Sequence, residues 1–306
     1  MIDRPMRYFG YLVAAAFLLF IVQVAAASDE NVGVTEITPT TLVVSTSGGN
    51  VVSSVGPDGA LLVGTPSASS TACISDIIGS RTKSPVRYVV IFPENSSHPE
   101  GDAGWQQRGA FVAMQENDLQ RLGGGGIGTM KSLPVHFEQP GVERPRVAFS
   151  EVLKFDLNGD AIHVVHQKPG YSNADSIAHF HKANLVYLGE VFPGDGYPKV
   201  DAAQGGTLEG LLTTLDGWAG SSVRIVPARG EVTDGSAVKQ YRDMIVAVRE
   251  KIESMATAGK TEEQIIAANT TVQFDERWGH GRVKPEEFVR EVYAAVKSNN
   301  AADQKK

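Results

Sequence analysis

Two pairs of histidines are the first candidates for chemistry in this sequence. His163 and His166 lie in or beside one predicted strand, and His179 and His181 lie in or beside the next. Successive side chains of a strand point to opposite faces, so His179 and His181 share a face whereas His163 and His166 do not. A hairpin could bring one histidine of the first pair beside the second pair. The group could bind a metal ion, and partly exposed sheet histidines are the alternative interpretation.

A second group of metal-binding residue types lies within one loop. Glu94, His98, Glu100 and Asp102 follow a predicted strand at short spacing. Carboxylates and an imidazole could hold a metal ion loosely there. Solvated loop charges are the competing interpretation.

Four consecutive glycines at residues 123–126, with Lys131 and Ser132 behind them, superficially resemble a phosphate-binding loop. The glycine that should precede the lysine is Met130, and no strand leads into the segment. We therefore predict no nucleotide site here.

Composition and charge exclude several classes of function. The chain has 306 residues, 28 of them Lys or Arg and 35 Asp or Glu, with a net charge of −7. A general electrostatic grip on nucleic acid needs a basic face, so we predict no nucleic-acid partner. The single cysteine, Cys73, excludes an intrachain disulfide and a zinc site built from thiolates. We expect Cys73 to be a small buried residue.

The amino terminus predicts export. Arg4 and Arg7 precede a mainly apolar stretch at residues 8–22, and small residues follow at 25–27. This order is typical of a secretory signal, so we predict that residues 1–27 are removed and that the protein is secreted or periplasmic, with no stable membrane span. An uncleaved anchor is the alternative, because the apolar stretch could just cross a bilayer.

The elements that must position these residues follow from periodicity. Short apolar and β-branched runs predict strands, and Asn158-Gly159 predicts a hairpin between two of them. The strands are expected at residues 42–44, 51–52, 60–63, 86–92, 109–114, 147–149, 152–155, 162–165, 176–180, 185–188 and 224–226. Helical spacing predicts helices at residues 72–78, 208–215, 241–255 and 285–296, and a short one opening at Thr261.

Two runs of strands, each followed by helices and joined without a linker, predict one layered α/β domain. We place it at residues 28–298, with a polar tail at residues 299–306.

Taken in order, these segments resemble the metallo-β-lactamase fold superfamily. Residues 183–192, ANLVYLGEVF, are similar to the family strand that ends in Gly-Asp. The remaining matches are residues 51–63, 85–90, 109–117, 158–166, 175–177, 205–207, 226–230, 241–244 and 274–279. The resemblance covers nearly all of the mature chain. It implies an α/β fold, the αββα four-layer sandwich, and hydrolysis at one or two zinc ions.

The departures from the family pattern fall on the metal ligands. The family's His-x-His-x-Asp-His loop corresponds to residues 93–98, where only the last histidine is retained. A later ligand histidine, the bridging aspartate and the last histidine are replaced as well. The ancestral metal-site positions of this chain are Pro93, Asn95, Ser97, His98, Tyr171, Glu190 and Arg229.

The chemistry of these replacements argues against a resident zinc ion. Zinc takes thiolate, neutral imidazole or carboxylate donors. Pro93 has no side-chain donor, and Arg229 is a permanent cation. His98 and Glu190 alone fall short of the three or four ligands that a zinc ion takes, so we expect no cofactor.

Two of the replaced positions carry alternatives of their own. Arg229 could form an ion pair with Glu190, grip an anionic ligand, or be a remnant without a role. Asn95, like Asn269, begins a glycosylation sequon, and a glycan there would stand at the mouth of the old site.

Three hypotheses follow for function. The first is an exported pseudoenzyme that binds a small molecule or a protein. The second is a metal-dependent hydrolase of esters, lactams or thioesters, with a remodelled mononuclear zinc site that uses His98, Glu190 and a recruited residue. The third is a metal-independent enzyme that uses Tyr171, Arg229 and Glu190.

Overall fold

The computed structural model of this protein describes residues 32–64, 68–92, 104–122 and 147–303. Three predictions fall outside these residues. They are the signal peptide at residues 1–27, the loop that carries Pro93, Asn95, Ser97 and His98, and the glycine-rich segment at residues 123–126. Glu94, Glu100 and Asp102 also lie outside the described residues. No helix in the described ranges is long and apolar enough to cross a membrane.

Two sheets form the centre of the fold. The first has the strand order β1-β2-β3-β4-β5-β6-β7, antiparallel as far as β4 and parallel beyond it. Its strands are β1 (Gly33–Thr38), β2 (Thr41–Thr46), β3 (Gly49–Ser54), β4 (Ala60–Val63), β5 (Val86–Val90), β6 (Phe111–Gln115) and β7 (Val147–Phe149). Except for β1, each corresponds to a predicted strand.

The second sheet has the order β13-β12-β11-β10-β9-β8, with β11 and β12 parallel and the other pairs antiparallel. Its strands are β8 (Val152–Leu157), β9 (Asp160–His166), β10 (Ser176–Phe180), β11 (Leu185–Gly189), β12 (Arg224–Pro227) and β13 (Thr233–Asp234). Because β11 and β12 are parallel, their carboxyl ends lie at the same edge of the sheet, and the loops that follow them lie side by side.

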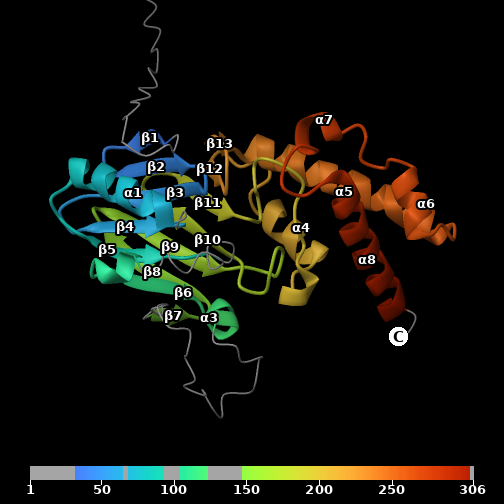
Figure 1. The fold of residues 1–306 in the computed structure, drawn as a ribbon, viewed down its shortest axis with the longest axis horizontal. Coiled ribbons are helices and arrows are strands. Elements are labelled where there is room, and N and C mark those ends of the chain that lie inside the picture. The colour runs from blue at the N-terminus through green and yellow to red at the C-terminus, as the bar shows by residue number, and fades with distance from the viewer. Residues whose placement is uncertain (1–31, 65–67, 93–103, 123–146, 304–306) are drawn as a thin grey trace, which may run out of the picture.

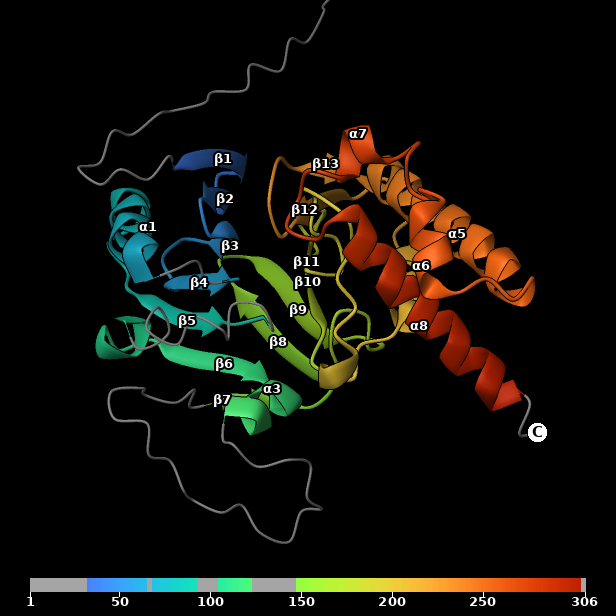
Figure 2. The same ribbon diagram turned by 45° about the vertical axis from the view of Figure 1, so that its right-hand side comes forward.

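Helices cover the outer faces of both sheets, which gives four layers (Figures 1 and 2). Helix α1 (Ala68–Arg81) covers the first sheet, and α4 (Leu208–Asp216), α5 (Gly235–Thr257) and α8 (Pro285–Asp303) lie on the side of the second. The shorter helices are α3 (Glu116–Leu122), the 3-10 helix at Ala202–Gln204, α6 (Glu262–Ala267) and α7 (Asp275–Trp278). The predicted four-layer αββα architecture is confirmed.

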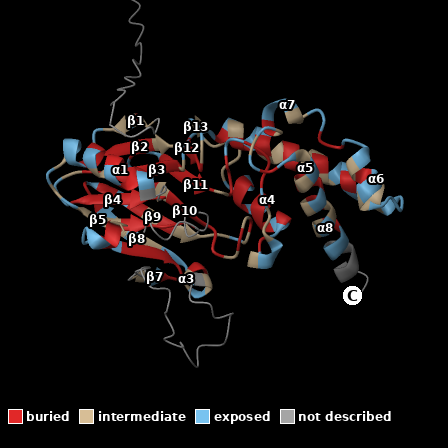
Figure 3. Cartoon of the chain, viewed as in Figure 1, coloured by how far each residue is buried: buried red, intermediate tan, exposed pale blue. Residues whose placement is uncertain are grey.

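Buried residues are concentrated on the two sheets (Figure 3), and three hydrophobic clusters hold the layers together. One lies between the sheets and includes Leu61 and Phe180. The second joins α1 to the first sheet through Ile74, and the third joins the second sheet to α4, α5 and α8 through Leu211 and Ile245. Apolar side chains removed from water in this way supply the main driving force for folding. Cys73 is buried in the second cluster, as predicted.

Helical structure extends beyond the sequence prediction at three places. Helix α1 has 14 residues rather than the predicted short turn at 72–78. Helix α3 occupies Glu116–Leu122, where we predicted no helix. Helix α8 continues to Asp303, past the residue 298 boundary of the predicted tail. In α1, packing of its apolar side chains outweighs the weak helix propensity of its Ser and Thr residues.

The predicted Asn158-Gly159 hairpin is present and fastens one sheet to the other. Asn158 adopts the left-handed backbone conformation, with φ +54°. Its backbone N donates to Oδ2 of Asp58 at 2.8 Å, and the backbone N of Asp58 donates back to Oδ1 of Asn158 at 3.2 Å. The side-chain nitrogen of Asn158 donates to Ser54 Oγ and to the Gly59 carbonyl. The hairpin tip of the second sheet is therefore hydrogen-bonded to the β3–β4 turn of the first sheet.

Candidate functional site

Glu190 and Arg229 come together because of the parallel pairing of β11 and β12. Glu190 directly follows β11, and Arg229 lies two residues after β12. The two loops bond to each other, since the backbone N of Arg229 donates to the Pro193 carbonyl at 3.0 Å. A β-carbon on Gly194, which has φ +85°, would lie 2.2 Å from the Arg229 carbonyl oxygen. Only glycine allows this close approach of the two backbones.

The first sheet also holds the Arg229 loop. The backbone N of Asn50, in β3, donates to the Ala228 carbonyl at 2.8 Å. Its side-chain nitrogen donates to the carbonyls of Pro227 and Gly230, each at 2.9 Å. The loop is thus tied to a strand that lies nearly 180 residues earlier in the chain.

The guanidinium of Arg229 is paired with two carboxylates. Nη1 donates to Oε1 of Glu190 at 2.5 Å and Nη2 to Oε2 at 3.1 Å, while Nε donates to Oδ2 of Asp195 at 2.7 Å. The side chains of Glu190 and Arg229 are each only 12 % exposed. A two-pronged, largely desolvated contact of this kind is stronger and more directional than a surface ion pair.

Tyr171 lies in the loop between β9 and β10 and lines one pocket together with Glu190 and Arg229. The loop is wrapped around the buried carboxylate of Asp175, which accepts from the backbone N of Gly170, Tyr171 and Ser172 at 2.9, 2.7 and 2.9 Å. The Ser172 hydroxyl donates a fourth hydrogen bond at 3.1 Å. Burial raises the pKa of Asp175 to about 6, against the opposing effect of these donors.

Burial also raises the pKa of Tyr171, and the nearby carboxylates of Asp201, Asp175 and Asp118 act in the same direction. Arg121 opposes them. The phenol therefore stays protonated at neutral pH and can donate a hydrogen bond, but it is a poor base.

The side chains of Tyr171, Glu190, Asp195 and Arg229 line a pocket of about 260 Å³. Its walls carry both signs of charge, since Glu190, Asp195 and Glu287 face the same space as Arg229, Lys199 and Arg282. Tyr171, Pro193, Tyr197 and Val283 complete the lining. A pocket of this composition fits a polar ligand rather than a purely apolar one.

The described residues do not fit a zinc ion. Both oxygens of Glu190 accept hydrogen bonds from Arg229. A dication at this carboxylate would have to displace a guanidinium that cannot lose its charge. Within the described ranges, no group of three or more His, Cys, Asp or Glu could hold a metal ion.

The structure brings together three of the seven predicted site positions, namely Tyr171, Glu190 and Arg229. Pro93, Asn95, Ser97 and His98 lie outside the described residues. Sequence reasoning missed Asp195, the second carboxylate on Arg229. The Pro193-Gly194-Asp195 turn so soon after Glu190 was the available signal, because it returns the chain toward the same edge.

The histidines group partly as predicted. His163 lies opposite His179 in the β9–β10 ladder, and His181 Nε2 is 3.0 Å from His163 Nδ1. The fourth, His166, contacts the Asn173 carbonyl at 3.0 Å instead.

The sequon at Asn269 is on an exposed turn, but the backbone carbonyl of its threonine, Thr271, accepts a hydrogen bond from the buried Tyr197 hydroxyl.

Comparisons with known proteins identify the fold. No protein-family model matches the chain, and no curated protein matches it. Among solved structures, a metallo-β-lactamase from Pontibacter korlensis is 16 % identical with a TM-score of 0.50, covering 74 % of this chain and 99 % of that one. The metallo-β-lactamase FIM-1 from Pseudomonas aeruginosa, in a mono-zinc form, is 15 % identical with a TM-score of 0.51, covering 69 % and 95 %.

A larger protein shares the fold as well. The sec-alkylsulfatase Pisa1 from Pseudomonas sp. is 14 % identical with a TM-score of 0.61, covering 86 % of this chain and 50 % of that one. This chain therefore spans about half the length of the alkylsulfatase. The chain has the metallo-β-lactamase fold, and the resemblance seen in the sequence is confirmed at that level.

Proposed function

We propose that this protein is an exported pseudoenzyme of the metallo-β-lactamase fold, in which an ion-pair network replaces the metal. The observation that carries the proposal is the two-pronged contact of Arg229 with Glu190, at the position of the family's bridging aspartate. In the family's zinc sites the metal supplies the positive charge that links these two loops. In this chain the guanidinium of Arg229 takes that place. It has no open coordination position and activates no water.

Loss of the metal removes the basis of the family's hydrolysis. A zinc ion lowers the pKa of its bound water and polarises a carbonyl oxygen. Neither Arg229 nor the protonated Tyr171 generates a nucleophile. Tyr171 as a general base, which the metal-independent hypothesis would need, is disfavoured by its raised pKa.

The remaining function of the pocket is binding. Asp195 and Glu190 already occupy the guanidinium of Arg229, so the pocket offers a ligand a set of fixed, paired charges rather than one strong cation. Lys199 and Glu287 add further polar groups to the wall. We propose a polar small molecule or a segment of a partner protein as the ligand.

A metal-dependent hydrolase with a mononuclear site is the second candidate. The observation in its favour is that Glu190 retains a carboxylate at a ligand position. One of the fold neighbours, the metallo-β-lactamase FIM-1, is known in a mono-zinc form. In this case Arg229 would have to leave Glu190 whenever the metal binds.

Metal content separates the two candidates. The purified protein is dialysed against zinc and then against buffer, and zinc per chain is measured by elemental mass spectrometry. We expect far less than one zinc ion per chain in the wild type and a higher content in Arg229→His, which removes the cation and adds an imidazole. Arg290→His, at an exposed arginine of α8, is the matched control and should behave as wild type.

Retention of one or two zinc ions by the wild type, lost in Glu190→Gln, would instead support the hydrolase. Ester, lactam and thioester hydrolysis should then be assayed with and without chelator.

A further inference from the structure

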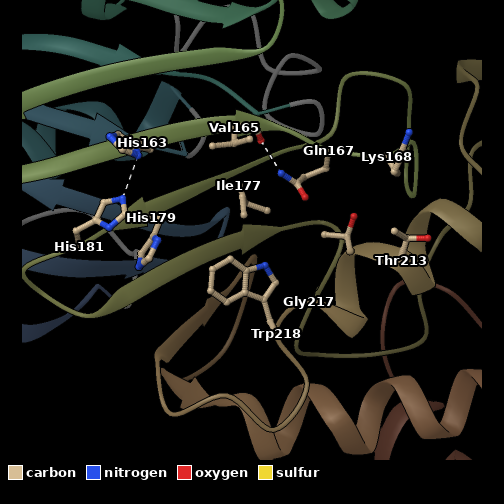
Figure 4. A pocket seen from close by; sticks show the side chains of 11 residues that line it. His163, Val165, Gln167, Lys168, Ile177, His179, His181, Thr213, Gly217 and Trp218 are labelled. Carbon is tan, nitrogen blue, oxygen red and sulfur yellow. Dashed lines mark hydrogen bonds between the residues drawn. The ribbon is translucent and has the colours of Figure 1, made fainter.

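A second pocket lies on the outer face of the second sheet, where α4 ends (Figure 4). It has a volume of about 350 Å³, within the range of small-molecule sites. Its lining residues differ entirely from those of the Arg229 pocket. One wall is the β9–β10 ladder, and the other is the end of α4 with Trp218.

One end of this pocket is made of imidazoles. The rings of His179 and His181 have their centres 4.0 Å apart, and those of His163 and His181 are 4.5 Å apart. His163 and His181 share one hydrogen bond, so one ring nitrogen donates and the other accepts. The edge-to-face contact between His179 and Trp218, at 5.6 Å, fixes the indole beside the cluster.

The middle of the pocket is apolar and the far end is polar. Val165, Ile177 and Trp218 provide the apolar walls, and Lys168 and Thr213 lie at the end away from the histidines (Figure 4). The lining therefore includes an ammonium group and three imidazoles, and its described residues include no carboxylate.

Thr214 is the independent sign that the pocket accepts a ligand. Its side chain lines the pocket, the residue is only 4 % exposed, and its Oγ1 has no hydrogen-bond partner among the described residues. A buried hydroxyl without a partner is costly, and such groups in folded proteins call for an explanation. A ligand atom in the pocket would supply the missing partner.

We propose that this pocket binds a small organic anion with a flat apolar body, such as an aromatic carboxylate or sulfonate. The body lies between Trp218 and the Val165–Ile177 wall, and the anionic group meets Thr214 and Lys168. The imidazoles at the other end add positive charge to the pocket as they take up protons. The site is distinct from the Arg229 pocket and does not depend on the function proposed for it.

Binding should strengthen as the pH falls. Burial and mutual repulsion lower the pKa of His163 and His179, with Lys154 acting further on His163 and Asp160 opposing on His179. On the side of α4, Asp216 is paired with Arg242. An anion favours the protonated rings, so protonation and binding assist each other.

Isothermal titration of the purified protein with 2-naphthalenesulfonate tests the proposal. The sulfonate stays ionised throughout, so any pH dependence arises from the protein. At about pH 5.5 we expect one molecule per chain, bound about tenfold more tightly than at about pH 7.5. The neutral 2-naphthalenesulfonamide, which has the same ring system, should bind weakly at both values.

Variants locate the site. Thr214→Val, which keeps the shape and removes the hydroxyl, should weaken binding about fivefold. Lys168→Ala, at an exposed residue, should weaken binding at both pH values. His280→Asn, outside the pocket, is the matched control and should change nothing.

Four results would overturn the inference. One is no binding near pH 5.5, and another is equal binding of the neutral sulfonamide. The third is binding that EDTA removes, which would indicate a metal. Loss of binding in Arg229→Ala but not in Lys168→Ala would also overturn it, and would assign the probe to the other pocket.

Discussion

Arg229 donates to both carboxylate oxygens of Glu190, and the two side chains are equally buried, at 12 % exposure each. The contact joins the loops that follow two parallel strands, which are also linked by the Arg229–Asp195 ion pair and by the hydrogen bond from the Arg229 backbone N to the Pro193 carbonyl. Under the proposed function, this contact places a permanent cation at a position where the family binds a metal. The stability and the chemistry of the site therefore depend on the same pair of residues.

Replacing one partner of the Arg229–Glu190 pair should destabilise the fold more than replacing both partners. Arg229→Met leaves the Glu190 carboxylate buried without its partner, and we expect a loss of about 2–4 kcal/mol in the free energy of unfolding. Glu190→Gln added to Arg229→Met should recover part of that loss, since the unpaired charge is gone. Urea unfolding of the double-mutant cycle measures the coupling.

Lys239→Ala is the control for this cycle. It breaks an exposed pair with Asp243 on α5 and should cost no more than about 0.5 kcal/mol. Strict additivity of the Arg229 and Glu190 substitutions would show that the contact adds no stability.

Asp175→Asn should loosen the loop that carries Tyr171. The carboxylate accepts four hydrogen bonds, whereas an amide oxygen can serve only those on one side and its NH2 group would face donors. We expect a loss of about 2–4 kcal/mol and faster amide exchange at Gly170 and Ser172. Exchange at these amides that matches wild type would contradict the assignment.

Glu291 should make stability depend on pH. Burial raises its pKa to about 7, with Glu287 and Asp201 adding to the rise. The folded protein then holds a proton that the unfolded chain has released, so this group's contribution to stability falls as the pH rises from about 4.5 to about 7. Above about pH 7 the ionised Glu291 carboxylate destabilises the folded state by a constant amount.

Glu291→Gln keeps an acceptor for the backbone N of Val200 and removes the charge. It should match wild type near pH 4 and be more stable by about 1–2 kcal/mol near pH 8, allowing for partial exposure. Glu286→Gln, exposed on the same helix, should show no such difference. A greater advantage at low pH would reverse the sign and refute the argument.

The hairpin tip at Asn158 offers a test of how the sheets are joined. Asn158→Gly retains the left-handed backbone and its own N–H bond to Asp58 but loses the side-chain hydrogen bonds with the Asp58 backbone N, Ser54 Oγ and the Gly59 carbonyl. We expect a cost of about 2 kcal/mol. Asn158→Ala should cost about 1 kcal/mol more, because alanine is strained at φ +54°. Thermal melts compare the two. Equal melting temperatures would mean that the tip relaxes.

Local signals predicted much of this fold. Asn158-Gly159 predicted a hairpin, and the resemblance to the metallo-β-lactamase fold placed Glu190 and Arg229 at one site. Helix α3 was missed because Glu116–Leu122 is short and directly continues a strand. Asp195 was missed because its role depends on a backbone approach at Gly194 between two distant loops. The Trp218 contact with His179 was missed because it depends on how α4 packs, which spacing does not determine.

The bonds from Asn50 to the Arg229 loop have a consequence for the order in which the protein forms. Asn50 is separated from Pro227 by 177 positions, so β3 leaves the ribosome long before the residues that it holds. Contacts that span so much of the chain form slowly, because the ends of a long loop must first meet. We therefore expect the site to be completed only after most of the chain has been synthesised.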